Sequence, residues 1–174
     1  MGGVNKRHSI RLPGFDYRQA GAYFVTICVN GRICVLGEVV NGETRLSALG
    51  DIANAGWRWL PTVFNTVEVP VYCVMPNHVH AIITIQERPK GNAPQGRGGL
   101  QTAPTKKPLG RIIGAYKTHS TSLVNKMNNT PGARLWQRNY YERIIRNETE
   151  YEAVCDYIQA NPMNWENDKE FQAK

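Results

Sequence analysis

Two apolar runs separated by a short turn make up residues 71–85, which read Val71-Tyr72-Cys73-Val74-Met75-Pro76-Asn77-His78-Val79-His80-Ala81-Ile82-Ile83-Thr84-Ile85. Valine, isoleucine and tyrosine fill both runs, and these residues suit the pleated, half-buried surface of a β-sheet. Pro76 cannot donate a backbone hydrogen bond, so it fits a turn better than the interior of a central strand. The stretch therefore predicts two buried strands joined at residues 75–77.

The second run carries two histidines at alternate positions. Side chains on a strand alternate between faces, so His78 and His80 point to one face and Val79 to the other, with the two histidine Cβ atoms roughly 6–7 Å apart. Burying two unpaired imidazoles side by side is unfavourable without a shared partner, so the pair favours a metal site over two merely packed histidines. A zinc, a non-haem iron, or a magnesium or manganese site could each use this pair, and two ligands complete none of them.

Composition predicts one domain with a polyanionic partner. The chain has 174 residues, 41% of them hydrophobic, which is enough for one full core and too little for two large domains. It carries 21 Lys+Arg against 14 Asp+Glu, and this charge of +7 makes nucleic acid the first candidate partner. The four cysteines have no C-x-x-C spacing, which predicts reduced structural thiols. No segment reaches the ~18 apolar residues of a membrane span, so we expect a cytoplasmic protein.

The chain on either side of this stretch predicts further strands and helices. Residues 23–29 and 33–37 are apolar and flank Asn30-Gly31-Arg32, in which Asn-Gly is a strong signal for a β-hairpin. Ser47 is the expected N-cap of a helix that reaches about residue 64. A strand at 67–74 then leads into the strand that carries the histidines.

The C-terminal half continues the same alternation of helices and strands. A helix is expected over 109–127 and a last strand over 141–145. Asn147 is the expected N-cap of a final helix that stops at Asn161-Pro162, because a residue before proline is disfavoured in the α region. This order of elements predicts an α+β fold with helices packed on an antiparallel sheet.

Segments of different composition flank and interrupt this domain. Residues 1–21 are basic and irregular, and we expect an N-terminal arm. Residues 22–165 form the predicted single domain, and 166–174 a C-terminal tail. Residues 87–108 are rich in Gly, Pro, Gln, Thr and Lys, a composition that buries too little apolar surface to order itself, so we expect a flexible loop.

A second pair of polar residues lies in the final predicted helix. Tyr157 and Asn161 are four residues apart, so their side chains share one face of the helix. A phenol beside an amide oxygen is what is needed if the amide completes a divalent metal site and the phenol attacks a phosphate held there. Tyrosine is a poor nucleophile at its ordinary pKa near 10, so this reaction requires a nearby cation. Tyr141 and Tyr116 are the alternative tyrosines.

Three segments together resemble a known family. Pro-Asn-His-Val-His-Ala-Ile-Ile at 76–83, Tyr-Tyr-Glu-Arg-Ile-Ile-Arg-Asn at 140–147 and Asp-Tyr-Ile-Gln-Ala-Asn-Pro at 156–162 resemble the single-tyrosine HUH transposases of bacteria, most closely the REP-associated tyrosine transposases. The resemblance implies a ferredoxin-like core of the HUH endonuclease type. It also implies a divalent metal, Mg²⁺ or Mn²⁺, held by His78, His80 and Asn161, with Tyr157 as the nucleophile.

The implied activity is cleavage and rejoining of single-stranded DNA at a hairpin or palindromic repeat, through a 5′-phosphotyrosine intermediate. The cationic residues expected to contact DNA are chosen by charge and location alone: Arg7, Arg11, Lys117, Arg138, Arg143 and Arg146. The sequence leaves open whether the chain acts as a monomer or a homodimer.

Two other functions stay open on the sequence. The first is a non-catalytic module of the same fold that binds hairpin DNA or RNA and cuts neither. The second is a zinc or iron enzyme acting on a small molecule, which needs a further acidic, histidine or cysteine ligand facing His78 and His80, and the sequence places no such residue.

Overall fold

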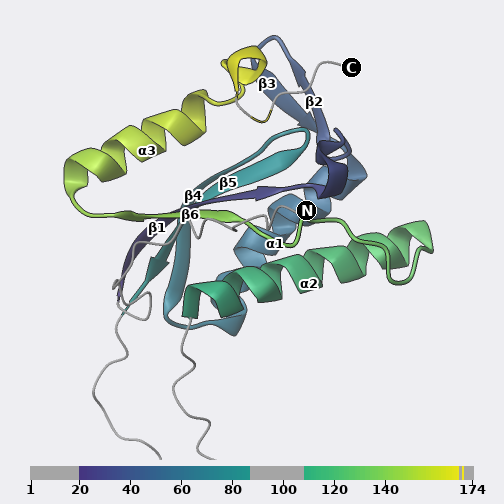
Figure 1. Ribbon diagram of the computed structural model, residues 1–174, viewed down its shortest axis with the longest axis horizontal. Helices are drawn as coiled ribbons and strands as arrows, with labels where there is room; N and C mark the ends of the chain where they lie inside the picture. The colour runs from purple at the N-terminus through teal and green to yellow at the C-terminus, as the bar shows by residue number, and fades with distance from the viewer. Residues whose placement is uncertain (1–19, 87–107, 169, 171–174) are drawn as a thin grey trace, which may run out of the picture.

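The computed structural model describes residues 20–86, 108–168 and 170. Four strands form one antiparallel sheet in the order β4-β5-β1-β6, and β2 and β3 form a separate hairpin (Figure 1). In chain order the elements are β1 (Gly21–Cys28), the 3-10 turn η1 (Asn30–Arg32), β2 (Gly37–Val40), β3 (Glu43–Leu46), α1 (Ala48–Val63), β4 (Val67–Val74), β5 (His78–Ile85), α2 (Pro108–Asn128), β6 (Tyr141–Ile145), α3 (Glu148–Ala160) and the 3-10 turn η2 (Trp165–Asn167).

This order confirms the predicted α+β fold. Helix α1 connects β1 to β4, and α2 connects β5 to β6, so the main sheet has the βαββαβ arrangement of a ferredoxin-like fold. The hairpin β2–β3 is inserted between β1 and α1, and α3 follows the last strand. The two strands predicted from residues 71–85 are β4 and β5, joined by the turn that contains Pro76.

The larger core lies between the sheet and helices α1 and α2. Strand β5 contributes Val79, Ala81 and Ile83 to it, at alternate positions. The rings of Trp57 and Tyr116 stack with their centroids 3.9 Å apart in the same core. Gly56 permits this approach of α2, because a Cβ at that position would lie 2.8 Å from the Tyr116 ring.

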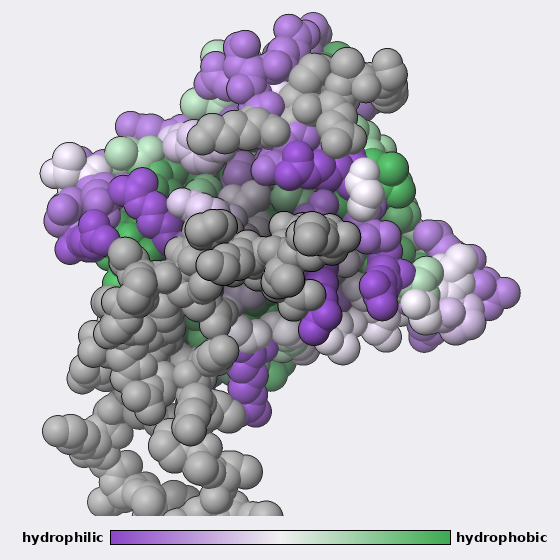
Figure 2. Space-filling model, in the orientation of Figure 1, coloured by the Kyte–Doolittle hydropathy of each residue, from purple (hydrophilic) through white to green (hydrophobic). Residues whose placement is uncertain are grey.

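The opposite face of the sheet carries α3 over a much smaller apolar cluster. Its buried members are Phe24, Ile82, Ile145 and Ile158. Because this cluster covers only part of the face, the end of the sheet where β5 begins is left to polar side chains. In the space-filling view, hydrophilic side chains also cover the outer face of α3 and the end of the molecule at which α2 stops (Figure 2).

Both predicted helix caps are confirmed. The Ser47 side chain accepts a hydrogen bond from the Gly50 amide at 3.2 Å, and Asn147 accepts one from the Glu150 amide at 2.8 Å. Helix α3 ends at Ala160, as expected, although Asn161 keeps α-helical angles (φ −57°, ψ −42°) despite preceding Pro162. The chain therefore turns directly beyond α3, which brings the following residues back toward the sheet.

The hairpin predicted at Asn30-Gly31 is wrong. Strand β1 pairs with β5 on one edge and with β6 on the other, so residues 33–37 have no edge of β1 left to join. Residues 30–32 form a 3-10 turn instead. The hairpin turn lies at Asn41-Gly42, which join β2 to β3 with φ of 53° and 76°, the positive angles that a type I′ turn requires.

The remaining expectations concern the cysteines, the membrane and the flanking segments. All four cysteines are free thiols. Among the described residues, no helix is long and apolar enough to cross a membrane. The expected N-terminal arm and the expected loop at 87–108 lie almost wholly outside the described residues, so both stay predictions.

Candidate active site

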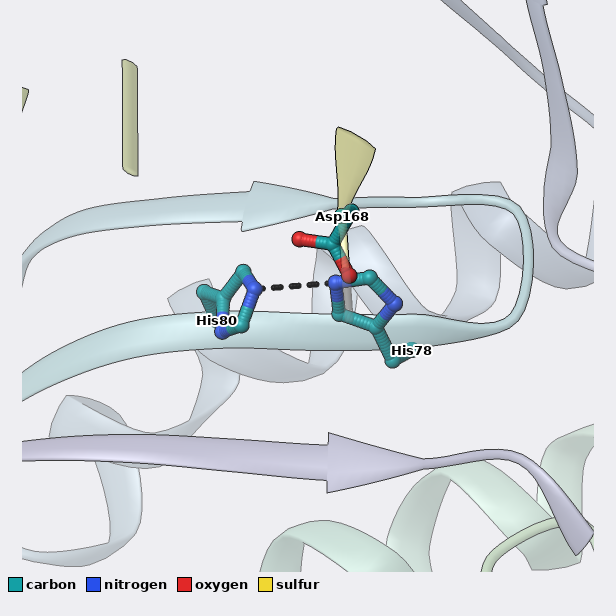
Figure 3. Close-up of side chains that lie close together, drawn as sticks. All are labelled: His78, His80 and Asp168. Carbon is teal, nitrogen blue, oxygen red and sulfur yellow. Dashed lines mark hydrogen bonds between the residues drawn. The ribbon is translucent and has the colours of Figure 1, made fainter. Parts of the chain in front are cut away.

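The two histidines lie at the start of β5, on the face that α3 covers. Their side chains are buried, with 0% of His78 and 2% of His80 exposed. The Nε2 atoms of the two rings face each other at 2.9 Å (Figure 3). The alternation of the strand thus places both imidazoles at one point, as the sequence predicts.

Asn77 fixes the tautomer of His78. The Asn77 amide nitrogen donates to the carbonyl oxygens of Glu170 (2.7 Å) and Arg32 (3.2 Å), which orients its Oδ1 toward His78 Nδ1 at 2.8 Å. An amide oxygen only accepts hydrogen bonds, so His78 Nδ1 carries the proton and His78 Nε2 a lone pair. An outer partner of this kind orients a histidine for metal binding.

Thr26 permits either tautomer of His80. Thr26 lies on the neighbouring strand β1, and its hydroxyl is 2.9 Å from His80 Nδ1. A hydroxyl both donates and accepts, so it satisfies Nδ1 in either tautomer. With Nε2 protonated, His80 donates to the His78 lone pair; with Nδ1 protonated, both Nε2 lone pairs are free for a shared cation.

Asp168 is the site residue that sequence reasoning missed. It follows η2. One of its carboxylate oxygens and one ring nitrogen from each of His78 and His80 all lie within 4.8 Å of one another. Figure 3 shows the carboxylate reaching over the two rings from the C-terminal segment. In the sequence, Asp168 sits in a short polar stretch without periodicity, so no local signal separates it from a solvated tail residue.

Helix α3 brings Tyr157 and Asn161 to the same point. The Tyr157 Oη atom lies 3.5 Å from His80 Nε2 and donates to Asp168 Oδ2 at 3.4 Å, while 45% of the tyrosine stays exposed. Asn161 is 2% exposed, and its amide nitrogen donates to Asp168 Oδ2 at 3.0 Å. Among the described residues, its buried Oδ1 has no hydrogen-bond partner, which is costly unless a cation or a donor satisfies it.

Burial sets the protonation of these groups. It lowers the pKa of His78 to about 4, with Asp168 opposing and Arg32 adding to the shift. Burial, together with the neighbouring His78, also lowers the pKa of His80 well below its ordinary range. Both imidazoles are therefore neutral at pH 7, the form that binds metal. Burial and the negative charge of Asp168 raise the pKa of Tyr157 to about 12, so its phenol is protonated until a cation stabilises the phenolate.

This donor set fits a divalent cation. His78, His80 and Asp168 can hold the ion, and the orphaned Oδ1 of Asn161 is a fourth candidate donor. Two imidazoles with a carboxylate and an amide oxygen suit Mn²⁺ well and Mg²⁺ less well. Relative to the predicted set of His78, His80 and Asn161, the structure adds Asp168.

The alternative tyrosines lie in other surroundings. Tyr116 is fully buried, and its hydroxyl donates to the Ala53 carbonyl at 3.0 Å, so it is a core residue. Tyr141 is 39% exposed on β6, and its ring packs edge-on against Phe24. Of these three tyrosines, Tyr157 is the one whose hydroxyl lies beside His80 and Asp168.

The cations expected to contact DNA also differ in their surroundings. The Lys117 ammonium donates to three carbonyl groups, at 2.9, 3.4 and 3.0 Å, which makes it a support for the chain segment at residues 137–139. Arg138, Arg143 and Arg146 are all exposed, and Arg143 pairs with Glu150 at 3.0 Å. Arg7 and Arg11 lie outside the described residues, and DNA contact by any of the six stays a prediction.

Comparison with known proteins places the chain in a family and identifies its fold. No family model matches it. An uncharacterized protein of Haemophilus influenzae is 39% identical over 171 residues, which cover 96% of this chain and 94% of that protein. The chain belongs to the same family as this protein.

Among solved structures, a REP-associated tyrosine transposase bound to a REP hairpin aligns with a TM-score of 0.58 at 20% identity, over 84% of this chain and 69% of that chain. The protein has the fold of that transposase, as the sequence resemblance implies. A protein of Deinococcus radiodurans provisionally described as a transposase aligns with a TM-score of 0.47 at 17% identity, over 83% of this chain and 92% of that chain.

Proposed function

We propose that this protein cleaves and rejoins single-stranded DNA at hairpins, using a divalent metal and Tyr157 as the nucleophile. The observation that carries the proposal is the convergence of four groups from three parts of the chain. Two neutral imidazoles from β5, the phenol of α3 and the carboxylate of Asp168 meet with contacts of 2.9–3.5 Å. A phosphodiester placed there would meet a cation site and a nucleophile together.

The metal site would be formed by His78, His80 and Asp168, with Asn161, whose amide nitrogen donates to Asp168, as a further candidate ligand through Oδ1. A bound Mg²⁺ or Mn²⁺ would polarise the scissile phosphate and stabilise the leaving 3′-oxygen. Asn77 holds the His78 imidazole and Thr26 holds the His80 imidazole, each through the Nδ1 atom, which leaves the Nε2 atoms facing the site. Because the imidazoles are neutral, they bring no positive charge that would repel a cation.

Tyr157 would attack the phosphorus in line with the 3′-oxygen. The bond between Tyr157 Oη and phosphorus forms as the bond between phosphorus and O3′ breaks, giving a 5′-phosphotyrosyl link and a free 3′-hydroxyl. The Asp168 carboxylate, which accepts a hydrogen bond from the Tyr157 hydroxyl at 3.4 Å, would take the phenolic proton. The departing 3′-oxygen would take a proton from water, and Asp168 would return its proton to the resulting hydroxide, so that no proton is gained or lost. Reverse attack by a 3′-hydroxyl rejoins strands without ATP, because each step exchanges one phosphodiester for another.

Hairpin DNA is the proposed substrate for three reasons. The chain carries a charge of +7, which favours a polyanion. The solved transposase that shares its fold is bound to a REP hairpin. The exposed Tyr157 also leaves the site open to a strand of DNA rather than closing it over a small molecule.

A metalloenzyme that acts on a small molecule is the second candidate. Asp168 supplies the further ligand that this reading requires, and two histidines with one carboxylate are the ligand set of many non-haem iron enzymes. Such an enzyme would bind Fe²⁺ and would not form a covalent complex with DNA.

The test is incubation with a 3′-labelled hairpin oligonucleotide that has single-stranded flanks, in Mn²⁺, Mg²⁺ or EDTA, followed by a denaturing gel. We expect a protease-sensitive adduct that requires metal, is absent in Tyr157→Phe and persists in Tyr141→Phe. If wild type and Tyr157→Phe bind the hairpin equally and neither forms an adduct with any of a panel of hairpins, the protein is a binding module.

A further inference from the structure

A second polar groove lies between α2 and the segment that follows it. The C-terminal half of α2 forms one wall and residues 129–138 form the other, and the open groove between them has a volume of about 770 Å³. Its lining includes three exposed cations and a row of hydroxyl and amide groups: Lys126, Arg134, Arg138, Thr121, Ser122 and Asn125. None of the described residues that line it is acidic. Figure 2 shows hydrophilic side chains at this end of the molecule.

The second wall of the groove is held rigidly against α2. Lys117 donates to the carbonyl groups of residues 137–139 and lies over the Tyr140 ring at 5.3 Å from its centroid. Asn125 donates to the Ala133 carbonyl at 3.0 Å, and the Trp136 indole donates to Ser120 Oγ at 2.9 Å. The groove is therefore formed before any ligand arrives, which lowers the entropic cost of binding.

The cations of the groove are available to a ligand. Within the described part of the chain, no carboxylate pairs with Lys126, Arg134 or Arg138, whereas Arg32 and Arg143 elsewhere form ion pairs with glutamates. Arginine, lysine, serine, threonine and asparagine side chains are the groups that contact the phosphates of duplex DNA. Trp136 is the one aromatic side chain among the described residues of the lining, and it is 5% exposed, so these residues offer no platform on which unpaired bases could stack.

The groove also lies close to the candidate active site. The Gln137 amide, on its second wall, donates to the Cys28 carbonyl of β1 at 2.9 Å, and Cys28 pairs with His78 of β5. Two lateral strand spacings of 4.7–4.9 Å put the backbone of Gln137 about 10 Å from that of His78. The groove lies on the α2 side of the sheet and Tyr157 on the α3 side, so a single-stranded flank that leaves the duplex would reach Tyr157 by passing around the β6 edge of the sheet.

We propose that this groove binds the phosphate backbone of the double-stranded stem of a DNA hairpin, through Lys126, Arg134 and Arg138. The proposal rests on the function proposed above and extends it: the stem and the cleaved strand occupy different sites. The stem site works through charge and backbone shape, and it needs no metal.

The test compares a double variant with a matched control. Arg134→Ala/Arg138→Ala removes two groove cations, and Arg45→Ala/Arg58→Ala removes two exposed arginines that do not line it. Fluorescence anisotropy in EDTA measures binding of a labelled hairpin and of an unstructured single strand of equal length over a range of salt concentrations. Unfolding temperatures establish that all proteins are folded.

We expect the groove variant to bind the hairpin at least roughly tenfold more weakly than wild type near 0.1 M salt. The slope of the logarithm of its binding constant against the logarithm of salt concentration should be smaller in magnitude by about two. The affinity of the control should stay within about twofold of wild type. Equal losses in both variants, no loss in either, or no binding of the hairpin by wild type would each overturn the proposal. So would a groove variant that loses affinity for the unstructured strand as much as for the hairpin.

A separate measurement distinguishes failure of the groove from failure of the proposed reaction. Adduct formation on an unstructured strand at saturating concentration with Mn²⁺ does not require the stem, so the groove variant should match wild type. If wild type forms no adduct with this strand or with any of the hairpins, but hairpin binding depends on the groove, the groove stands and the catalytic proposal falls. If adducts form and the groove variant binds the hairpin as well as wild type does, the catalytic proposal stands and the groove proposal falls.

Discussion

The two faces of the main sheet differ in what they bury. On the side of α1 and α2, strand β5 contributes Val79, Ala81 and Ile83 to a continuous apolar core. On the side of α3, the alternate residues of the same strand are His78, His80 and Ile82, of which only Ile82 joins an apolar cluster. One strand thus provides stability through one face and chemistry through the other.

This division explains how a site of buried polar groups is tolerated. Leaving such groups without full partners costs stability, and the larger core on the opposite face offsets that cost. It also predicts that mutations on the two faces have different effects: changes under α1 and α2 alter unfolding alone, whereas changes under α3 also alter metal binding or reaction.

The largest expected effect on stability comes from the adjacent isoleucines of β5. Ile82 and Ile83 are both fully buried, on opposite faces. Ile83→Ala and Ile82→Ala should each lower the free energy of unfolding by about 2–5 kcal/mol, measured by urea denaturation. Only Ile82→Ala should also slow adduct formation, because α3 rests on this residue through Ile158. An equal slowing by Ile83→Ala, at a temperature where both variants are folded, would contradict the division.

Removal of a metal ligand should have the next largest effect. His80→Ala should weaken Mn²⁺ binding by about 100-fold or more, since even the loss of an outer partner costs 10–100-fold. Calorimetric titration measures this. His119→Ala is the control, because His119 stacks on Trp59 at 3.8 Å on the other side of the sheet and should leave the affinity unchanged. Unaltered Mn²⁺ affinity in His80→Ala would contradict a metal site on the α3 face of the sheet.

The outer partner of His78 should have a smaller effect. Asn77→Ala removes the oxygen that holds His78 Nδ1–H, so we expect Mn²⁺ affinity to fall about 10–100-fold. Asn77→Asp keeps an acceptor at this position and should recover most of the affinity. Equal losses in the two variants would show that Asn77 acts through its bonds to Arg32 and Glu170 and not through the tautomer.

Acid should destabilise the protein through the same histidines. The folded state keeps the pKa of His78 near 4, whereas an unfolded histidine titrates near 6.5. Between these values the unfolded state binds the proton and the folded state does not, so stability falls as pH falls from 6.5 toward 4, by at most about 1.4 kcal/mol per pH unit for this group. Thermal unfolding from pH 8 to 4 measures the slope, and His78→Gln should flatten it. Constant stability over this range would contradict the burial of neutral histidines.

The elements of the fold were predictable where the signal is local. The alternation of residues 71–85 and the caps Ser47 and Asn147 predict β4, β5, α1 and α3, because propensity and capping act within a few residues. The Asn-Gly signal at 30–31 failed because the pairing of β1 is decided by distant strands, β5 and β6. The same signal at Asn41-Gly42 is the real turn, and local sequence does not separate the two.

The site was predictable to the extent that its residues share an element. His78 and His80 on one strand, and Tyr157 and Asn161 on one helix, follow from spacing within each element. The family resemblance, and not the spacing of the residues, predicted that these two pairs would meet. Asp168 reaches the site only because the chain reverses after Asn161, and nothing local encodes that path.

The most direct test of the account is to identify the residue that carries DNA. After reaction with a hairpin and Mn²⁺, nuclease and trypsin digestion leaves a nucleotide remnant on one peptide, and fragmentation by mass spectrometry locates it. We predict the remnant on Tyr157, within the peptide that spans residues 147–169, and not on Tyr151 of the same peptide. A remnant on Tyr151 or Tyr141, or an adduct that forms equally well in EDTA, would contradict the account.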